Sequence, residues 1–287
     1  MAYARTRRAV FNHLQVVMQY LYKKLLKLRP SMLAAVLKRL LLVRRRIVVR
    51  PEGRFFIDPV TNFGQYLLRP AGYEPTLTRS VQQLLSPGDV FLDVGANEGW
   101  FSVIGARAVG PSGLVIAIEP QSRVIQVLHR NIAENDLTNV FSVQRAISDS
   151  PGVAKLFLAP NTNTGSSGLY RGTRYWNPVE SVPQTTLEAL LALLRVDKIR
   201  LMKMDIEGFE YEAVLGSRGL FQSGLIEHIA LELHPGLLER RGKSADEILQ
   251  FLAACGYARN ADFKNLVLSR GSRAAGAGGG TAVAAAA

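Results

Sequence analysis

The middle of the chain alternates short apolar runs with amphipathic segments. The apolar runs, which are typical of buried strands, cover residues 90–92, 114–118, 140–143, 200–204 and 226–233. Segments of helical periodicity lie between the first three runs, around residues 99–108 and 122–135. Strands that alternate with helices predict an α/β domain in which helices cover both faces of a mostly parallel sheet.

A different pattern precedes this domain. Apolar residues recur at spacings of three and four over residues 10–28, with lysines between them, which predicts a basic amphipathic helix. Pro30 ends this helix, and Ser31 can cap a second one that runs up to the three arginines at positions 44–46. Glycines and prolines punctuate residues 47–74, which we interpret as a short hairpin and a loop.

These patterns divide the chain into three parts. We predict a helical extension over residues 1–50, an α/β domain over residues 51–269, and a Gly/Ala-rich tail over residues 270–287. The tail has no periodicity, and its composition favours disorder.

Charge separates the extension from the domain. The formal net charge is +12, yet the 13 basic residues among the first 50 occur without an acidic one, which leaves 22 basic against 23 acidic residues elsewhere. A nearly neutral domain argues against nucleic acid as a partner. The basic helices suit attachment to an anionic membrane surface, and they suit equally well a helical cap with a solvated basic face.

Residues 31–43 are too short to span a bilayer, and Lys38 and Arg39 interrupt them. No small-residue cleavage site follows a short apolar stretch near the start of the chain. Cys255 is the single cysteine, lies in an apolar stretch and is expected to be an inert buried thiol. We therefore expect a cytoplasmic protein. Whether the extension attaches it peripherally to a membrane stays open.

Candidate chemistry begins directly after the first strand of the domain, in the sequence Gly-Ala-Asn-Glu-Gly at residues 95–99. Ligands of open parallel sheets bind outside the carboxyl ends of the strands, where glycine permits a tight turn and close approach of backbone amides. Asp93 ends the first strand, and Glu119 ends the next, where a carboxylate can accept hydrogen bonds from ribose hydroxyls. The loop lacks the glycine spacing that cradles a diphosphate, so a nucleotide-dependent oxidoreductase of NAD type is the less favoured alternative.

Residues 93–102, D-V-G-A-N-E-G-W-F-S, resemble the first motif of the FkbM-type methyltransferases. The resemblance spans residues 53–268 and includes Tyr73 with Glu74, residues 119–120, 146–148 and 182–187, and a K-x-D-I-E-G-x-E signature at residues 203–210. It implies a Rossmann-like class I methyltransferase fold and an enzyme that uses S-adenosyl-L-methionine. The cofactor-binding positions that we predict are Asp93, Gly95, Asn97, Gly99, Glu119 and Ala146.

The acidic signature follows the strand that ends at Met204 and should face the same crevice as Gly95. A hydroxyl that attacks a methyl sulfonium must lose its proton, which requires a carboxylate or an imidazole nearby. We predict catalytic roles for Asp205 and Glu207, with His234 as the candidate general base, and an acceptor-binding role for Glu210.

Other interpretations of these groups stay open. His234 can be a structural histidine before Pro235, and Lys203 can be a buried partner that turns the carboxylates into an ion-pair network. Asp205, Glu207, Glu232 and His234 could also hold a divalent metal. We disfavour the metal because the donor is already activated by its positive sulfur, so that alignment of the hydroxyl can suffice.

Residues 161–178 mix hydrogen-bonding groups with aromatic rings. Tyr170, Tyr175 and Trp176 are predicted to pack against an acceptor, while an ordinary hairpin excursion explains them equally well. The family resemblance implies O-methylation of a hydroxyl, on a sugar, a glycolipid or a glycosylated natural product. N- or C-methylation and a membrane-associated pseudoenzyme that only binds the cofactor are the remaining alternatives.

Overall fold

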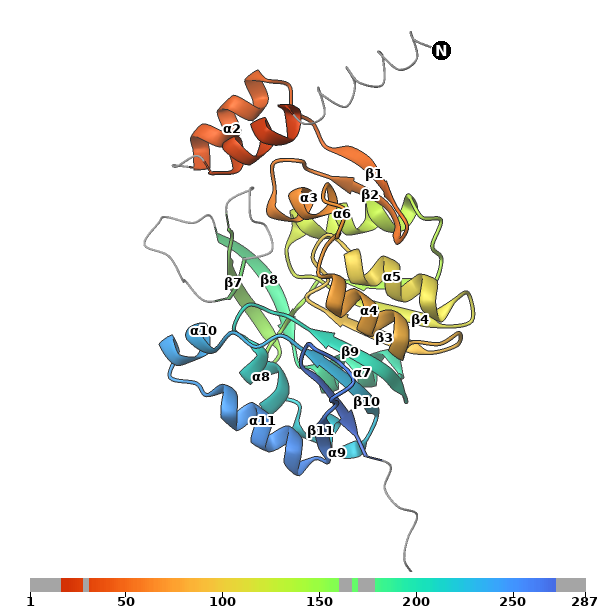
Figure 1. Cartoon of the computed structure of the whole chain (residues 1–287). Helices are drawn as coiled ribbons and strands as arrows, with labels where there is room; N and C mark the ends of the chain where they lie inside the picture. Colours follow the sequence, from red (N-terminus) through yellow and green to blue (C-terminus); the bar gives the residue numbers. More distant parts are fainter. Residues whose placement is uncertain (1–16, 28–30, 160–166, 170–178, 272–287) are drawn as a thin grey trace, which may run out of the picture.

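The computed structural model describes residues 17–27, 31–159, 167–169 and 179–271 (Figure 1). The described part of the extension contains a helix over residues 17–27 and α2 (Ser31–Leu40), followed by the antiparallel hairpin of β1 (Arg46–Arg50) and β2 (Gly53–Ile57). Tyr22 and Leu25 are buried against Val60, so the extension packs on the domain. No helix in the described ranges is long and apolar enough to cross a bilayer.

The domain is built on a seven-stranded sheet with the order β11-β12-β10-β9-β3-β4-β5. Its strands are β3 (Val90–Val94), β4 (Leu114–Ile118), β5 (Val140–Val143), β9 (Ile199–Met204), β10 (Ile226–Leu231), β11 (Tyr257–Arg259) and β12 (Val267–Arg270). The five strands from β5 to β10 run parallel, and β12 is antiparallel to both of its neighbours. The predicted α/β architecture with a mostly parallel sheet is confirmed.

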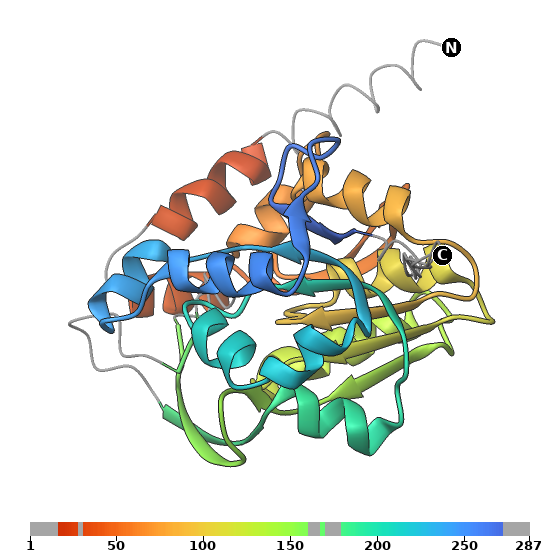
Figure 2. The same cartoon turned by 90° about the horizontal axis from the view of Figure 1, so that it is seen from below.

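Both faces of this sheet are buried. Along β3 and β9, Phe91 and Leu201 belong to one hydrophobic cluster, while Leu92 and Met202 belong to the other, as alternation across a pleated sheet requires. The first face is covered by α4 (Pro75–Leu84) and α5 (Trp100–Val109), with α3 (Asn62–Leu67) and α6 (Ser122–Ala133) beside them. The second face is covered by α7 (Leu187–Leu194), α8 (Glu210–Leu215), α9 (Arg218–Ser223), α10 (Pro235–Arg240) and α11 (Ala245–Ala254). Helices on either side of the strands are visible in Figure 2.

A small three-stranded sheet follows β5 along the chain. It has the order β6-β8-β7 and consists of β6 (Ala146–Ile147), β7 (Gly152–Phe157) and β8 (Val179–Thr185), with β7 and β8 antiparallel. Ala146 pairs with Gln184, and Ile147 pairs with Thr185. Two segments of the family resemblance that lie far apart in the sequence are therefore hydrogen-bonded neighbours.

The stretch predicted as hairpin and loop departs from expectation after β2, because it contains the helix α3. Thr61 caps this helix by accepting a hydrogen bond from the amide of Gly64. A Cβ on Gly64 would lie 1.9 Å from the Asp58 carbonyl oxygen, so the turn needs glycine there. The glycines and prolines of residues 47–74 predicted only turns, and the capping role of Thr61 was not predicted.

Candidate active site

The loop over residues 95–99, called here the glycine loop, lies between the ends of β4 and β9. The amides of Gly95 and Ala96 both donate to the carbonyl of Ile118, at 3.0 and 2.9 Å. A Cβ on Gly95 would lie 1.9 Å from the Asp205 carbonyl oxygen, so only glycine lets the loop pass the end of β9. Gly95, Asn97 and Gly99 all have left-handed backbone, with φ of 79°, 50° and 91°.

Glu119 faces the glycine loop from the end of β4. Its carboxylate accepts hydrogen bonds from the amides of Asn97, at 3.0 Å, and Gln121, at 2.9 Å. Burial raises the pKa of Glu119 to about 7, although the two amides oppose this shift. The carboxylate is therefore fixed in place by two backbone donors.

A pocket lies at the carboxyl ends of β3, β4 and β9. Four of the predicted cofactor residues line it, namely Gly95, Asn97, Glu119 and Ala146, together with the predicted catalytic residues Asp205 and Glu207. The remaining lining residues are Val94, Ile118, Pro120, Gln121, Arg145, Ile147, Leu156, Ser167, Gly168, Leu169, Ile206 and Phe209. Glycine loop, acidic signature and small sheet thus enclose one space.

The structure places the other two predicted cofactor residues, Asp93 and Gly99, outside the lining. Asp93 is fully buried and accepts a hydrogen bond from Ser102 at 2.6 Å. Gly99 is the N-cap residue of α5, and a Cβ there would lie 2.4 Å from a methyl group of Leu128. Asp93 and Gly99 therefore contact the elements next to the glycine loop and do not line the pocket.

Lys203 joins the loop to the acidic residues. Its side chain is 4% exposed, and its Nζ donates to the Gly95 carbonyl at 2.8 Å. The same Nζ lies 3.7 Å from Asp93 Oδ1 and 3.8 Å from Asp205 Oδ2. Burial opposes the charge, but Asp205 and Asp93 raise the pKa of Lys203 above its usual value. The structure therefore supports the interpretation of Lys203 as a buried partner of the carboxylates.

His234 is surrounded by the three carboxylates of the acidic signature. Its Nδ1 lies 3.0 Å from Glu210 Oε1, and its Nε2 lies 3.8 Å from Asp205 Oδ1 and 3.7 Å from Glu207 Oε2. Glu210 begins α8, is fully buried, and also accepts hydrogen bonds from the amides of Ile206 and Gly208. This buried position suits a residue that orients His234. It does not suit the acceptor-binding role that was predicted for Glu210.

The ionisable groups of this cluster have different pKa values. Burial opposes protonation of His234, but its hydrogen bond with Glu210 and the nearby carboxylates raise its pKa to about 9. Burial and the charge of Asp205 raise the pKa of Glu207 to about 7. At neutral pH the imidazole is therefore a cation and a donor, and Glu207 is the group whose pKa matches that of a general base.

The same residues offer a metal-binding geometry. Asp205, Glu207 and His234 each present one ligand atom, and these atoms lie within 4.8 Å of one another. The Asp205 Oδ1 atom is buried and has no hydrogen-bond partner among the described residues. A divalent cation and a hydroxyl-bearing acceptor are the two kinds of ligand that this arrangement could take.

One residue near the cluster, Glu74, had no role predicted from the sequence. It is the N-cap residue of α4, with a left-handed φ of 38° and no side-chain cap hydrogen bond. Burial raises the pKa of Glu74, while Tyr73 and Lys203 oppose this shift and Glu232 adds to it. Its place beside the cluster could have been suspected only from its part in the family resemblance. The predicted acceptor contacts Tyr170, Tyr175 and Trp176 lie outside the described residues.

The sequence matches a family model described as the methyltransferase FkbM domain over residues 93–258. A methyltransferase, sdnD, of Sordaria araneosa is 31% identical over 160 residues, which cover 45% of this chain and 61% of that protein. An arsenite methyltransferase of Halobacterium salinarum is 36% identical over 56 residues, which cover 20% of this chain and 14% of that protein. The chain thus spans less than two thirds of either relative.

Among solved structures, a methyltransferase FkbM from Methylobacillus flagellatus is similar with a TM-score of 0.40 and 16% sequence identity. That similarity covers 77% of this chain and 48% of the other.

Proposed function

Because this chain belongs to the FkbM methyltransferase family, we propose that it transfers the methyl group of S-adenosyl-L-methionine to a hydroxyl group of a sugar or a glycolipid. The predicted class I, Rossmann-like fold is confirmed by this membership and by the mostly parallel sheet. The observation that carries the proposal is the pocket, which is lined after β3 and β4 by the glycine loop and Glu119, called here the cofactor end, and after β9 by Asp205 and Glu207, called here the acceptor end.

The residues of the first end fit the cofactor. Glu119 is the acceptor for the two ribose hydroxyls, and Gly95 lines the pocket beside it, where the loop backbone receives the methionine moiety. The buried Asn97 Oδ1 has no hydrogen-bond partner within the described part of the chain, so it can accept from a ligand donor. When bound, the cofactor supplies an electrophilic methyl group on a positively charged sulfur.

The residues of the second end serve the acceptor. Methyl transfer forms an oxygen–carbon bond and breaks a sulfur–carbon bond, and the acceptor hydroxyl gives up its proton. We assign that proton to Glu207, whose pKa of about 7 lets it accept at neutral pH. His234, with a pKa of about 9, is assigned to orientation of the carboxylates in place of the base role predicted from the sequence. Asp205 aligns the hydroxyl.

A thermal-shift comparison separates this function from the nucleotide-dependent alternative. We expect S-adenosyl-L-methionine and S-adenosylhomocysteine to raise the melting temperature and NAD to leave it unchanged. A stabilisation by NAD alone would reject the proposal. Formation of S-adenosylhomocysteine with a panel of glycan and glycolipid acceptors then distinguishes an enzyme from a pseudoenzyme.

The exposed surface of the extension supports a proposal about where in the cell the protein acts. Leu40 and Leu42 are 72% and 73% exposed, and they lie near the exposed basic residues Arg39 and Arg46. We propose that this surface contacts an anionic membrane, where each basic group near the surface contributes about 1 kcal/mol. Sedimentation with anionic vesicles tests it: Leu40→Ser with Leu42→Ser should weaken binding, and equal, salt-insensitive partitioning of both proteins would exclude it.

A further inference from the structure

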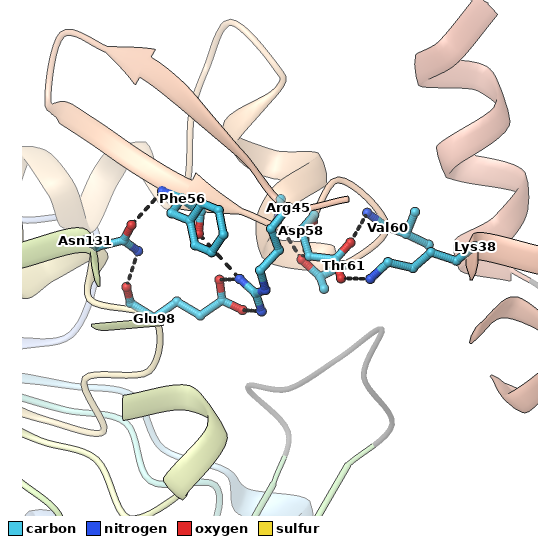
Figure 3. Close-up of polar contacts among 9 residues, drawn as sticks. Lys38, Arg45, Phe56, Asp58, Val60, Thr61, Glu98 and Asn131 are labelled. Carbon is cyan, nitrogen blue, oxygen red and sulfur yellow. Dashed lines mark hydrogen bonds and ion pairs between the residues drawn. The ribbon is translucent and has the colours of Figure 1, made fainter. Parts of the chain in front are cut away.

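One residue of the extension reaches the back of the glycine loop. Arg45 lies just before β1, and its guanidinium holds Glu98 with two hydrogen bonds, Nη1 to Oε2 at 2.9 Å and Nη2 to Oε1 at 3.1 Å (Figure 3). The Glu98 side chain is fully buried, and Arg45 is 26% exposed. Such a bidentate pair fixes both the position and the orientation of the carboxylate.

The pair belongs to a closed ring of contacts between three parts of the chain. Asn131 of α6 donates to the Glu98 carbonyl at 2.7 Å and accepts from the Phe56 amide at 2.6 Å. The Arg45 guanidinium lies over the Phe56 ring, 5.9 Å from its centroid. Figure 3 shows Glu98 between Asn131 and Arg45, with Phe56 closing the ring. The hairpin, α6 and the glycine loop are thereby tied together.

The glycine loop needs such support because of its backbone. Gly95 and Gly99 adopt left-handed φ freely, but Asn97 between them has a left-handed φ of 50°, which persists in a non-glycine residue when surrounding contacts impose it. Glu98 lies between Asn97 and Gly99, and its side chain is absent from the pocket lining. Asn97 in turn lines the pocket and donates its amide to Glu119. A shift of Glu98 would therefore displace the residues that contact the cofactor.

We propose that Arg45 is a positioning residue for the methyl donor, which acts through Glu98 to hold the glycine loop in its binding conformation. The sequence analysis assigned residue 45 to an extension outside the site. The contacts make it a part of the cofactor site, without contact to the ligand. The inference rests on the proposed function only in that the glycine loop holds S-adenosyl-L-methionine.

The test compares Arg45→Ala with Arg44→Ala in the full chain, since the neighbouring Arg44 is exposed and its loss removes the same charge. Calorimetric titration should show that the Kd for S-adenosyl-L-methionine rises about tenfold in Arg45→Ala and stays unchanged in Arg44→Ala, as expected for loss of a hydrogen bond to a buried charge. Arg45→Lys keeps the positive charge but cannot form the bidentate pair with Glu98, so it should give an intermediate Kd for S-adenosyl-L-methionine. Glu98→Gln combined with Arg45→Ala should cost less than the two changes added together.

A second readout needs no ligand. In hydrogen exchange of the free protein, the amides of Asn97 and Gly99 should exchange about tenfold faster in Arg45→Ala than in Arg44→Ala. Equal Kd values and equal exchange in the two variants would overturn the proposal. Faster exchange without any affinity of the wild type for S-adenosyl-L-methionine would support the role of Arg45 in the loop and refute the proposed function. If Arg45→Ala fails to fold, the Arg45→Lys measurements decide.

Discussion

The two ends of the pocket differ in how their polar groups are satisfied. At the cofactor end, Glu119 accepts two backbone amides within 3.0 Å, and Glu98 is held by two hydrogen bonds from Arg45. At the acceptor end, Asp205 and Glu207 approach the His234 Nε2 no closer than 3.7 Å, beyond hydrogen-bond distance. The carboxylates of Glu119 and Glu98 are thus held by donors of the chain, while Asp205 Oδ1 has no hydrogen-bond partner among the described residues and can meet a ligand.

The largest effect is expected from a substitution that changes the acceptor end alone. Asp205→Asn should lower methyl transfer by at least about a hundredfold, since the hydroxyl loses its aligning charge. The Kd for S-adenosyl-L-methionine should stay within about threefold, a change of less than 1 kcal/mol. A labelled-donor assay and calorimetry measure the two quantities. Unchanged turnover would remove Asp205 from the mechanism, and parallel loss of both would show that the two ends are not separable.

Next in size is the loss of the proposed base. Glu207→Gln should lower the rate by about a hundredfold. In the wild type the rate should rise with pH through about 7, because Glu207 must be deprotonated to accept a proton, and fall again through about 9 as His234 loses its charge.

Glu239→Gln serves as the matched control for this profile. Glu239 is exposed on α10, so its variant should keep the wild-type rate and both pH limbs. The profiles are compared at saturating donor, because Glu119 also has a pKa of about 7 and can affect donor binding in the same pH range. If the Glu207 variant retained the acidic limb under these conditions, the proton would have to go elsewhere.

A smaller effect should follow from a change at the cofactor end. Glu119→Gln leaves one carbonyl oxygen where two carboxylate oxygens accept hydrogen bonds, so the Kd for S-adenosyl-L-methionine should rise about tenfold. The turnover number at saturating donor should stay close to that of the wild type. Steady-state kinetics with varied donor separates the two, and a fall in turnover with an unchanged Kd would count against a ribose-binding role.

The smallest effect should come from a helix end on the second face of the sheet. Ser244 caps α11 by accepting from the amides of Asp246 and Glu247. Ser244→Ala should cost about 1 kcal/mol of stability and lower the melting temperature by about 2–4 °C. Donor affinity and turnover should not change. A change in donor affinity or in turnover would mean that the stability of α11 affects the pocket.

The same contrast explains what could be predicted from the sequence. The glycine loop, Glu119 and Asp205 were identified because each follows directly on a strand, and parallel strands bring their carboxyl ends to one edge. Arg45 and Glu98 are 53 residues apart, and no local pattern links them. Likewise, the burial of Glu210 and Asp93 depends on how α8 and Lys203 pack, which spacing does not reveal.

The central claim is tested most directly by the fate of a labelled methyl group. Full-length protein is incubated with methyl-labelled S-adenosyl-L-methionine and a panel of sugar and glycolipid acceptors, and the labelled product is located by NMR. The proposed function predicts that the label becomes an ether methyl on a former hydroxyl, with one S-adenosylhomocysteine formed per methyl transferred, and that Asp205→Asn forms both at least about a hundredfold more slowly. Label on a nitrogen or a carbon, or no S-adenosylhomocysteine from a protein that binds the donor, would contradict it.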